Sequence, residues 1–292
     1  MKLLEMADNM IKTREFREHN YKAVWFNGKT IRMTIDPKRE ISELEYPEFY
    51  DIKITGYCQG YCPWCYMNSS KEDYHYEDII DKVKDYFGPM SSNERPFQVA
   101  IGGGEPTAHP QFIDLLSAFK ELGIEPNYTT NGMFDDRKIL EASKEFCGGV
   151  AVSCHPHLKL YWEKVAEKYL SESIKLNFHI IISDVESVDY FTMIYNKWKD
   201  KIDYFVLLPY TAQGRAAEKD IDWKYLVDKL PKNTQKIAFG AGFYPYLLRK
   251  DHDIQVSLYE PEIMSKFLDL KDMQLYPSSF DLTPIIKEIK CR

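Results

Sequence analysis

The sequence predicts an α/β fold, a partial (β/α)6 TIM-like barrel with an N-terminal β-hairpin and a C-terminal extension. Six short apolar runs alternate with amphipathic stretches of helical period, which is typical of repeated βα units. Two of these runs, at 178–182 and 204–208, are almost continuously apolar or β-branched, as strands buried on both faces require. Because eight such units close a full barrel, six units followed by sequence of another kind predict an open one.

Length, composition and charge exclude a disordered chain and argue against a protein that binds nucleic acid or enters a membrane. The chain has 292 residues, of which 44% are hydrophobic, enough for a substantial core, and this excludes a wholly disordered chain. The net charge of −7 argues against a broad electrostatic contact with nucleic acid, which is therefore not the expected partner. No run of about eighteen apolar residues occurs, and the first residues become charged before a signal peptide can form. We therefore expect a cytoplasmic protein that does not enter a membrane.

The elements are expected in a definite order along the chain. The Asn27–Gly28 pair between two strand-like runs predicts a β-hairpin within an N-terminal extension, residues 1–46. Helices whose apolar residues keep helical spacing are expected to end at Gly88 and Gly123. The barrel, residues 47–225, is expected to contain strands near 49–55, 97–102, 125–130, 148–153, 175–182 and 203–208.

Residues 226–292 are expected to form an extension that covers the barrel mouth. This part is rich in Tyr, Pro and Asp, and its periodicity does not define a fold. Its aromatic side chains, among them Phe243, Tyr244 and Tyr246, are expected to keep water away from the mouth.

Three of the six cysteines crowd into one loop. Cys58, Cys62 and Cys65 directly follow the strand 49–55 and so lie at the carboxyl end of a strand, where the sites of α/β barrels are built. Three thiolates suit a soft metal, either zinc or an iron–sulfur cluster. A structural zinc needs a fourth ligand, for which His75 is the nearest candidate. A four-iron cluster held by three cysteines instead keeps one iron open for another molecule.

This loop and a second motif together resemble a known family. The pattern Cys-x3-Cys-x-aromatic-Cys, with Trp64 at its aromatic position, resembles the signature of the radical S-adenosylmethionine (radical SAM) superfamily. The next strand runs into Gly-Gly-Gly-Glu-Pro at 102–106, which is similar to that family's Gly-Gly-Glu-Pro motif and follows at the expected distance. The resemblance covers about residues 48–215.

The resemblance implies an enzyme, an oxidoreductase in broad class, with a 4Fe-4S cluster and S-adenosyl-L-methionine as cofactors. Cys58, Cys62 and Cys65 would ligate the cluster, and the open iron would chelate S-adenosylmethionine. One electron would cleave the sulfur–C5′ bond and give a 5′-deoxyadenosyl radical, which abstracts a hydrogen atom from a peptide or small-metabolite substrate. A reductase such as flavodoxin or ferredoxin is the implied partner.

The resemblance also implies contacts to S-adenosylmethionine from the first two strand ends. Trp64 would pack beside the adenine and Tyr66 would offer it backbone groups, with packing in the core as the alternative for both. The glycine turn would bind the methionine amine, and an ordinary strand-to-helix turn is the alternative there. The residues of this turn are Gly103, Gly104, Glu105 and Pro106.

Further contacts are implied at the ends of later strands. Asn131 and Ser153 are candidates for the ribose or carboxylate, with turn formation as the alternative role of Asn131. Leu208 would place apolar backbone against the adenine. Arg215 would hold the cofactor carboxylate or an anionic substrate group, unless it is a solvated or helix-capping arginine. The family's glycine-rich motif is not evident in the strand 175–182.

The fourth strand is followed by Cys154, His155 and His157, which are further candidates for chemistry. The Cys154 thiol is a speculative hydrogen donor to a substrate radical, with a small hydrophobic role as the alternative. The two histidines are candidates for substrate binding or acid–base chemistry, although no third ligand accompanies them.

Two other classes of function compete with a radical SAM enzyme of unknown substrate. One is a non-catalytic iron–sulfur or zinc protein with a structural or redox-sensing cluster, and the other is a nucleic-acid-modifying enzyme of the same chemistry. A single cluster is expected in each iron–sulfur case. Cys147, Cys154 and Cys291 remain after the first three cysteines, one fewer than another four-cysteine cluster requires.

Overall fold

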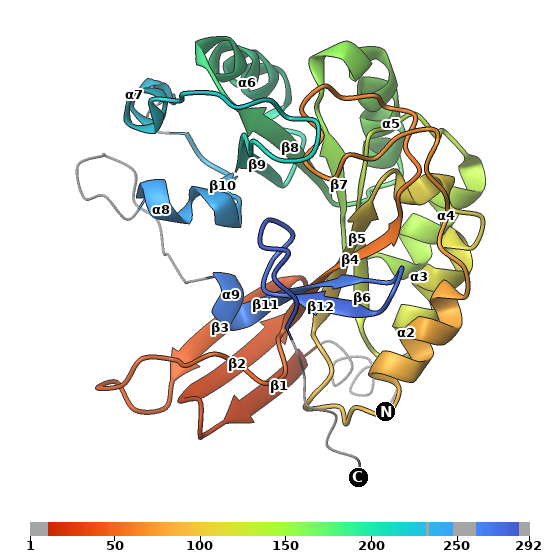
Figure 1. Cartoon of the computed structure of the whole chain (residues 1–292), viewed down its shortest axis with the longest axis vertical. Coiled ribbons are helices and arrows are strands. Elements are labelled where there is room, and N and C mark those ends of the chain that lie inside the picture. The colour runs from red at the N-terminus through yellow and green to blue at the C-terminus, as the bar shows by residue number, and fades with distance from the viewer. Residues whose placement is uncertain (1–10, 232–233, 248–260, 286–292) are drawn as a thin grey trace.

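The computed structural model describes residues 11–231, 234–247 and 261–285. Within these ranges the strands form two sheets, a small antiparallel one and a large, mostly parallel one. Figure 1 shows the small sheet at one side of a curved main sheet whose helices lie along its outer surface. The predicted α/β class and partial TIM-like barrel are therefore confirmed. No helix in the described ranges is both long enough and apolar enough to cross a membrane.

The small sheet contains the predicted hairpin and one more strand. Strands β2 (Tyr21–Phe26) and β3 (Lys29–Thr34) are joined at Asn27 and Gly28, whose φ angles of 51° and 77° both lie in the left-handed region that such a turn requires. The additional strand β1 (Ile11–Phe16) pairs with β2, which becomes the central strand. The buried Trp25 stacks on Phe97, and this contact attaches the small sheet to the start of a barrel strand.

Six parallel strands form the centre of the main sheet, in sequence order. Their bounds agree with the predicted ranges to within two residues, and each one pairs with the next. They are β4 (Phe49–Thr55), β5 (Gln98–Gly103), β6 (Glu125–Thr130), β7 (Val150–Ser153), β8 (Leu176–Ile182) and β9 (Tyr204–Pro209).

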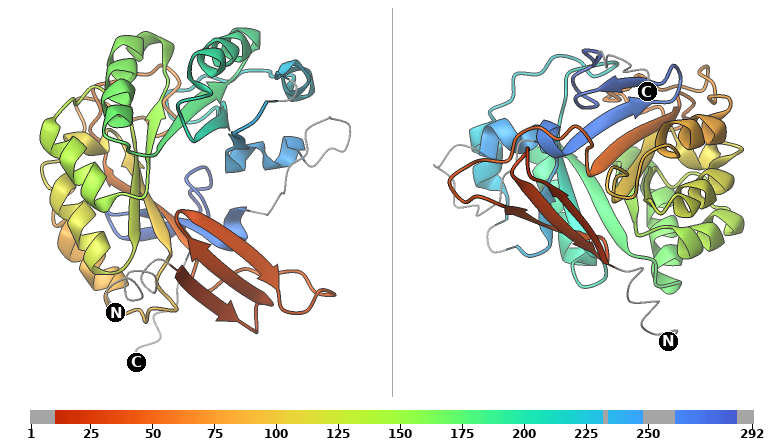
Figure 2. Two further views of the ribbon diagram at one scale, coloured as in Figure 1. Left: turned by 180° about the vertical axis from the view of Figure 1, so that it is seen from behind. Right: turned by 90° about the horizontal axis from the view of Figure 1, so that it is seen from below.

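Helices connect these strands and cover one face of the sheet, as both views in Figure 2 show. They are α2 (Ile79–Phe87), α3 (Phe112–Glu121), α4 (Arg137–Phe146), α5 (Lys159–Ser171), α6 (Val185–Trp198) and α7 (Trp223–Lys229). Gly123 has φ 71° and ends α3 in the expected left-handed way. Gly88 instead keeps right-handed helical angles after α2, so it does not terminate that helix by the left-handed conformation.

Alternate residues of each strand face the helices. On β4, Tyr50, Ile52 and Ile54 are at most 1% exposed and join the main hydrophobic core. Tyr50 packs edge-on against Phe87 of α2, with ring centres 5.3 Å apart. Residues at the other positions, such as Asp51 on β4, point to the opposite face, called here the inner face of the barrel.

The described parts of residues 226–292 extend the main sheet at both edges. Strand β10 (Ile237–Phe239) lies beside β9, while β11 (Ser265–Asp269) lies parallel to β4 and pairs with β12 (Gln274–Tyr276). Phe243 and Tyr246 pack on Trp223 of α7, with ring centres 5.4 and 4.6 Å away. The domain boundaries and the covering role of this part stay predictions.

Short helical segments complete the described chain. They are η1 (Pro106–Ala108), η2 (Pro156–Leu158), η3 (Ala241–Phe243), α8 (Tyr244–Leu247) and α9 (Pro261–Met264). Cys291 lies outside the described residues.

Candidate active site

The three clustered cysteines lie on the loop that follows β4, and we call residues 56–70 the cysteine loop. Cys58, Cys62 and Cys65 are all half-buried free thiols. The backbone N–H of Cys58 donates to the Ser70 carbonyl at 2.8 Å, and the N–H of Cys65 donates to the Cys62 carbonyl at 3.2 Å. These bonds fold the loop back on itself at the carboxyl end of β4.

The sulfur atoms occupy a polar but desolvated environment. Cys58 Sγ accepts hydrogen bonds from the Gly60 backbone N–H at 3.4 Å and from Asn131 Nδ2 at 3.6 Å. Burial raises the pKa of the Cys58 thiol to about 11 and that of Cys62 to about 12, and the neighbouring thiols add to the rise. The Cys58 and Cys62 thiols are therefore protonated at neutral pH, and a bound metal would have to displace those protons.

The structure gives no support to a zinc site completed by His75. The His75 ring lies 3.0 Å from Thr55 Oγ1 and packs against Tyr57 and His109, at 4.9 and 5.1 Å between ring centres. No three His, Cys, Asp or Glu side chains in the described ranges converge on a single metal position. An iron–sulfur cluster makes a different demand, because each cysteine binds a different iron atom and the sulfurs need not converge.

Several buried polar atoms of the cysteine loop have no partner in the protein. Gln59 Oε1, Trp64 Nε1 and Ser69 Oγ are buried without a hydrogen-bond partner among the described residues. Buried polar groups of native proteins are usually paired, so such a concentration in one loop points to a ligand held there. The donor set and these atoms together fit a bound cluster with its cofactor.

The glycine turn after β5 packs directly against the start of the cysteine loop. A Cβ on Gly103, whose φ is 111°, would lie 2.5 Å from the Thr55 carbonyl oxygen, and one on Gly104 would lie 2.0 Å from that of Tyr57. These two glycines are therefore required by backbone packing. A Cβ on Gly102 would meet nothing within 4 Å, so the open space at this turn lies beside Gly102.

The Glu105 carboxylate is almost fully buried, with 1% of the residue exposed, and donors of the protein surround it. Thr107 donates through its backbone N–H and its hydroxyl, Thr130 Oγ1 lies at 2.8 Å, and the Asn131 N–H lies at 2.8 Å. Burial raises the pKa of Glu105, and these hydrogen bonds partly offset the rise. Glu105 thereby joins the β5 turn to the end of β6, with Pro106 buried in the adjoining η1.

Trp64 and Tyr66 contact different parts of the barrel. The Trp64 ring lies edge-on to His155 and His157, at 5.7 and 5.3 Å between centres. Tyr66 packs against Phe280 at 5.0 Å. Burial raises the pKa of Tyr66 to about 12. The two aromatic residues therefore connect the cysteine loop to the β7 end and to the C-terminal part of the chain.

The later strand ends place two of the predicted polar groups near this loop. Asn131 approaches the Cys58 sulfur, and its Oδ1 also accepts from the Met133 N–H at 2.9 Å, so it has a turn-forming role as well. Ser153 pairs in register with His179, at an alternate position from the core residue Val152, and so lies on the inner face. Leu208 likewise alternates with the core residue Leu207.

The residues after β7 divide between the core and the inner face. Cys154 is 2% exposed, belongs to the main core, and directs its thiol at the Val152 carbonyl at 3.5 Å. The structure therefore does not bring this thiol to the inner face. His157 Nε2 lies 3.1 Å from the Gly60 carbonyl oxygen. Burial lowers the pKa of His155 and of His179 to about 4, so both imidazoles are neutral at pH 7.

Arg215 lies in the segment after β9, and its guanidinium donates hydrogen bonds to the cysteine loop. Its Nη2 donates to the Ser69 carbonyl at 2.6 Å, its Nε to the Cys62 carbonyl at 3.4 Å, and its Nη1 to Asn68 Oδ1 at 3.4 Å. The guanidinium therefore holds the loop that carries the thiols, and its contact with the cofactor carboxylate or with an anionic substrate group stays a prediction.

The backbone of Gly214 and Arg215 also contacts the cysteine loop. The Arg215 N–H donates to the Cys65 carbonyl at 3.1 Å. At Gly214, whose φ is 64°, a Cβ would lie 2.4 Å from the Tyr66 carbonyl oxygen. Only glycine fits this close approach between the two loops.

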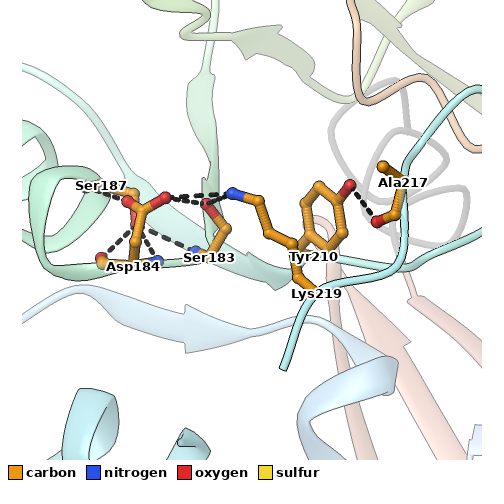
Figure 3. Close-up of polar contacts among 6 residues, drawn as sticks. All are labelled: Ser183, Asp184, Ser187, Tyr210, Ala217 and Lys219. Carbon is orange, nitrogen blue, oxygen red and sulfur yellow. Dashed lines mark hydrogen bonds and ion pairs between the residues drawn. The ribbon is translucent and has the colours of Figure 1, made fainter. Parts of the chain in front are cut away.

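The segment 210–222 has a second anchor on the far side of the barrel mouth, shown in Figure 3. Lys219 Nζ pairs with Asp184 Oδ2 at 3.2 Å and lies 3.5 Å from Ser183 Oγ. The same ammonium lies 5.0 Å from the ring centre of Tyr210, whose hydroxyl donates to the Ala217 carbonyl at 2.7 Å. We call 210–222 the strap, since it runs between the cysteine loop and the N-terminus of α6.

Sequence reasoning missed two polar residues of the inner face, Asp51 on β4 and His179 on β8. The signal for both was strand alternation: Asp51 lies between Tyr50 and Ile52, and His179 lies between two core residues. It also missed Thr130 as a partner of Glu105.

Comparisons with known proteins agree with this architecture. A family model described as "Radical SAM superfamily" matches residues 52–157. SuiB of Streptococcus suis bound to S-adenosylmethionine superposes with a TM-score of 0.67 at 14% identity, over 91% of this chain and 81% of SuiB. The enzyme anSMEcpe with bound AdoMet and Cp18Cys peptide gives 0.56 at 14% identity, over 80% and 75% of the two chains.

No curated protein sequence matches the chain. The family match covers the β4 strand, the cysteine loop, the glycine turn and the β7 end. Residues 52–157 thus form a radical SAM domain, the domain of a superfamily of enzymes whose cofactors are a 4Fe-4S cluster and S-adenosylmethionine.

Proposed function

We propose that this enzyme binds one 4Fe-4S cluster through Cys58, Cys62 and Cys65, cleaves S-adenosylmethionine reductively and abstracts a hydrogen atom from a peptide. The observation that carries the proposal is the cysteine loop itself. Three thiols lie on one loop at the carboxyl end of β4, beside buried polar atoms that lack partners. When bound and reduced, the cluster supplies the electron that breaks the sulfur–C5′ bond and so produces the hydrogen-abstracting radical.

Residues of the protein position the cysteine thiols and stabilise their thiolate form. The Gly60 N–H and the Asn131 amide donate to the Cys58 sulfur, and such bonds stabilise a thiolate ligand. Arg215 contributes a positive charge near Cys62, which favours the thiolate form of that cysteine. The strap thereby orients the loop and tunes one of its ligands.

For S-adenosylmethionine, the space beside Gly102 is the best supported place for the methionine amine. A Cβ on Gly102 would meet nothing within 4 Å, so the methionine amine has room there, and the Glu105 carboxylate holds the turn in position through Thr130 and Asn131. Trp64 offers an aromatic edge and an unpaired Nε1 donor on the opposite side. The other proposed contacts are Tyr66, Gly103, Gly104, Pro106, Asn131, Ser153 and Leu208.

A peptide is favoured as substrate over a small metabolite. SuiB, bound to its precursor peptide SuiA, superposes with a TM-score of 0.65, and anSMEcpe carries a bound peptide. The proposed electron donor is a reductase such as flavodoxin or ferredoxin. Tyr61 of the cysteine loop is 70% exposed, so the loop lies close to a surface that a donor can reach.

Anaerobic reconstitution with iron and sulfide tests the ligand assignment. The parent protein should take up a cluster and, with dithionite and S-adenosylmethionine, form 5′-deoxyadenosine measurable by mass spectrometry. The triple Cys→Ala variant of the loop should do neither, whereas Cys147→Ala, which removes a thiol outside the loop, should do both. Iron binding without deoxyadenosine under any condition would favour a structural or redox-sensing cluster, and stoichiometric zinc in place of iron would favour the zinc alternative.

A further inference from the structure

The strand that leads to the cysteine loop carries an acidic side chain on its inner face. Asp51 lies between Tyr50 and Ile52, both of which pack with the helices, so its side chain points to the opposite side. Thr55, four residues later, ends the strand. Asp51 therefore lies inside the barrel, about 13 Å below the end of the strand at Thr55 at a rise of about 3.3 Å per residue.

Nothing in the described protein neutralises this carboxylate. Within residues 11–231, 234–247 and 261–285, the Asp51 side chain makes no hydrogen bond and no ion pair. The nearest cation on the same strand, Lys53, is already paired with Asp269 at 3.1 Å. Burial alone raises the pKa of Asp51 to about 7, with no neighbouring charge acting against it. The Asp51 side chain is half-buried, so a ligand can reach it, and a partly desolvated carboxylate without a protein partner is typical of a functional group rather than a structural one.

Two aromatic side chains lie near Asp51. Phe267 of β11 is its register partner, so both side chains point to the same face, and Phe267 packs against Tyr276 at 5.8 Å between ring centres. Tyr66 of the cysteine loop is close enough for the Asp51 charge to raise the pKa of its hydroxyl. Figure 1 shows β11 beside β4 and β12 next along the sheet, although both strands are far from β4 in sequence. On the other side, the register partner is the small Ala100, which leaves room.

A carboxylate beside aromatic rings is the combination that recognises organic cations. The carboxylate forms a charge-assisted hydrogen bond, and the rings attract the cation through their faces. An anionic group would meet repulsion from Asp51, and a neutral apolar group would leave the carboxylate unpaired.

We propose that Asp51, with Phe267 and Tyr66, binds a cationic group of the substrate, a primary ammonium or a guanidinium. On a peptide this group is a lysine or arginine side chain or the N-terminal amine. The inference rests on the proposed function, because it places the cationic group of a peptide inside the same barrel. It adds the chemical class of substrate that the barrel selects.

The test measures binding of short peptides to the cluster-loaded protein with S-adenosylmethionine and no reductant, by calorimetry. The probes are acetyl-Gly-X-Gly-amide peptides in which X is lysine, arginine, norleucine or glutamate. Gly-norleucine-Gly-amide without the acetyl group reports on the N-terminal amine. At least one cationic probe should bind about tenfold or more tightly than acetylated norleucine, as expected for one charge-assisted hydrogen bond.

Asp51→Asn should reduce that preference to within about twofold, since it keeps the shape and removes the charge. Asn127→Ala is the matched control, because Asn127 is an inner-face residue of β6 without charge and its change should leave the preference intact. In the parent protein the preference should also weaken from pH 8 to pH 6 as Asp51 becomes protonated, a readout that needs no variant.

Equal binding of norleucine and all cationic probes by the parent protein would overturn the inference. So would a cationic preference that survives in Asp51→Asn. Deoxyadenosine formation with dithionite is measured in parallel. Its presence without a cationic preference would refute the cation site alone, and its absence with the preference intact would refute the catalytic proposal alone.

Discussion

Replacing Arg215 by methionine removes the guanidinium that ties the strap to the cysteine loop while keeping much of the side chain's apolar length. The wild-type side chain makes one short bond, 2.6 Å to the Ser69 carbonyl, and two longer ones of 3.4 Å to Cys62 and Asn68. A hydrogen bond from a charged donor contributes about 1.5–3 kcal/mol. Because the two longer bonds add little, about 2 kcal/mol is expected for local opening of the loop, roughly a thirtyfold larger open population.

Hydrogen–deuterium exchange under anaerobic conditions measures this opening. Amides of the cysteine loop should exchange roughly thirtyfold faster in Arg215→Met, and the loaded cluster should be lost faster to an iron chelator. Lys219→Met is the matched control, since it frees the other anchor of the strap at Asp184 without touching the cysteine loop. Unchanged exchange of residues 58–70 in Arg215→Met, or equal acceleration in both variants, would refute the clamping role.

Three further outcomes are expected. Reconstituted protein should contain about four irons per chain, and a reproducible value near twice that, measured colorimetrically, would indicate a second cluster. Glu105→Ala should weaken S-adenosylmethionine binding about tenfold or more in equilibrium dialysis, because the buried donors around Glu105 lose their acceptor. Glu105→Gln should lose less affinity. Equal affinity of the parent and both variants would contradict this role of Glu105. Because burial raises the pKa of Asp51 to about 7, the native state holds a proton that the unfolded chain releases near pH 4. The stability of the parent relative to Asp51→Asn should therefore fall from about pH 4 to about pH 7 and stay level above, as denaturant unfolding would show.

Much of the central fold could be predicted because its signals are local. Buried parallel strands such as Phe178–Ile182 are continuous apolar runs, and the Asn27–Gly28 turn demands two left-handed residues in succession. The C-terminal strands could not be predicted in the same way. Strand β11 is short, and its partner β4 lies more than 200 residues earlier, so its stability comes from a pairing that no local window contains.

Part of the candidate site could likewise be predicted from local sequence, and part depends on contacts between distant segments. Spacing alone identified Cys58, Cys62 and Cys65, because a loop that presents several thiols must carry them close together in sequence. Spacing also selected the glycine turn, but the reason for Gly103 and Gly104 proved to be the backbone of residues 55–57, where β4 ends and the cysteine loop begins. His75 likewise looked available for a metal until the structure showed its contacts with Thr55 and Tyr57.

The sequence by itself predicted the class of fold, the radical SAM domain and the three thiols proposed as cluster ligands, since each depends on residues that are neighbours along the chain. Only the tertiary structure decided what Arg215 holds, which face Cys154 occupies and that Asp51 has no hydrogen-bond or ion-pair partner among the residues that the structure describes. Those properties depend on which atoms of distant segments the fold brings into contact. The sequence gives the charge of a side chain, but the residues that the fold packs against it decide whether an opposite charge or a hydrogen bond compensates that charge.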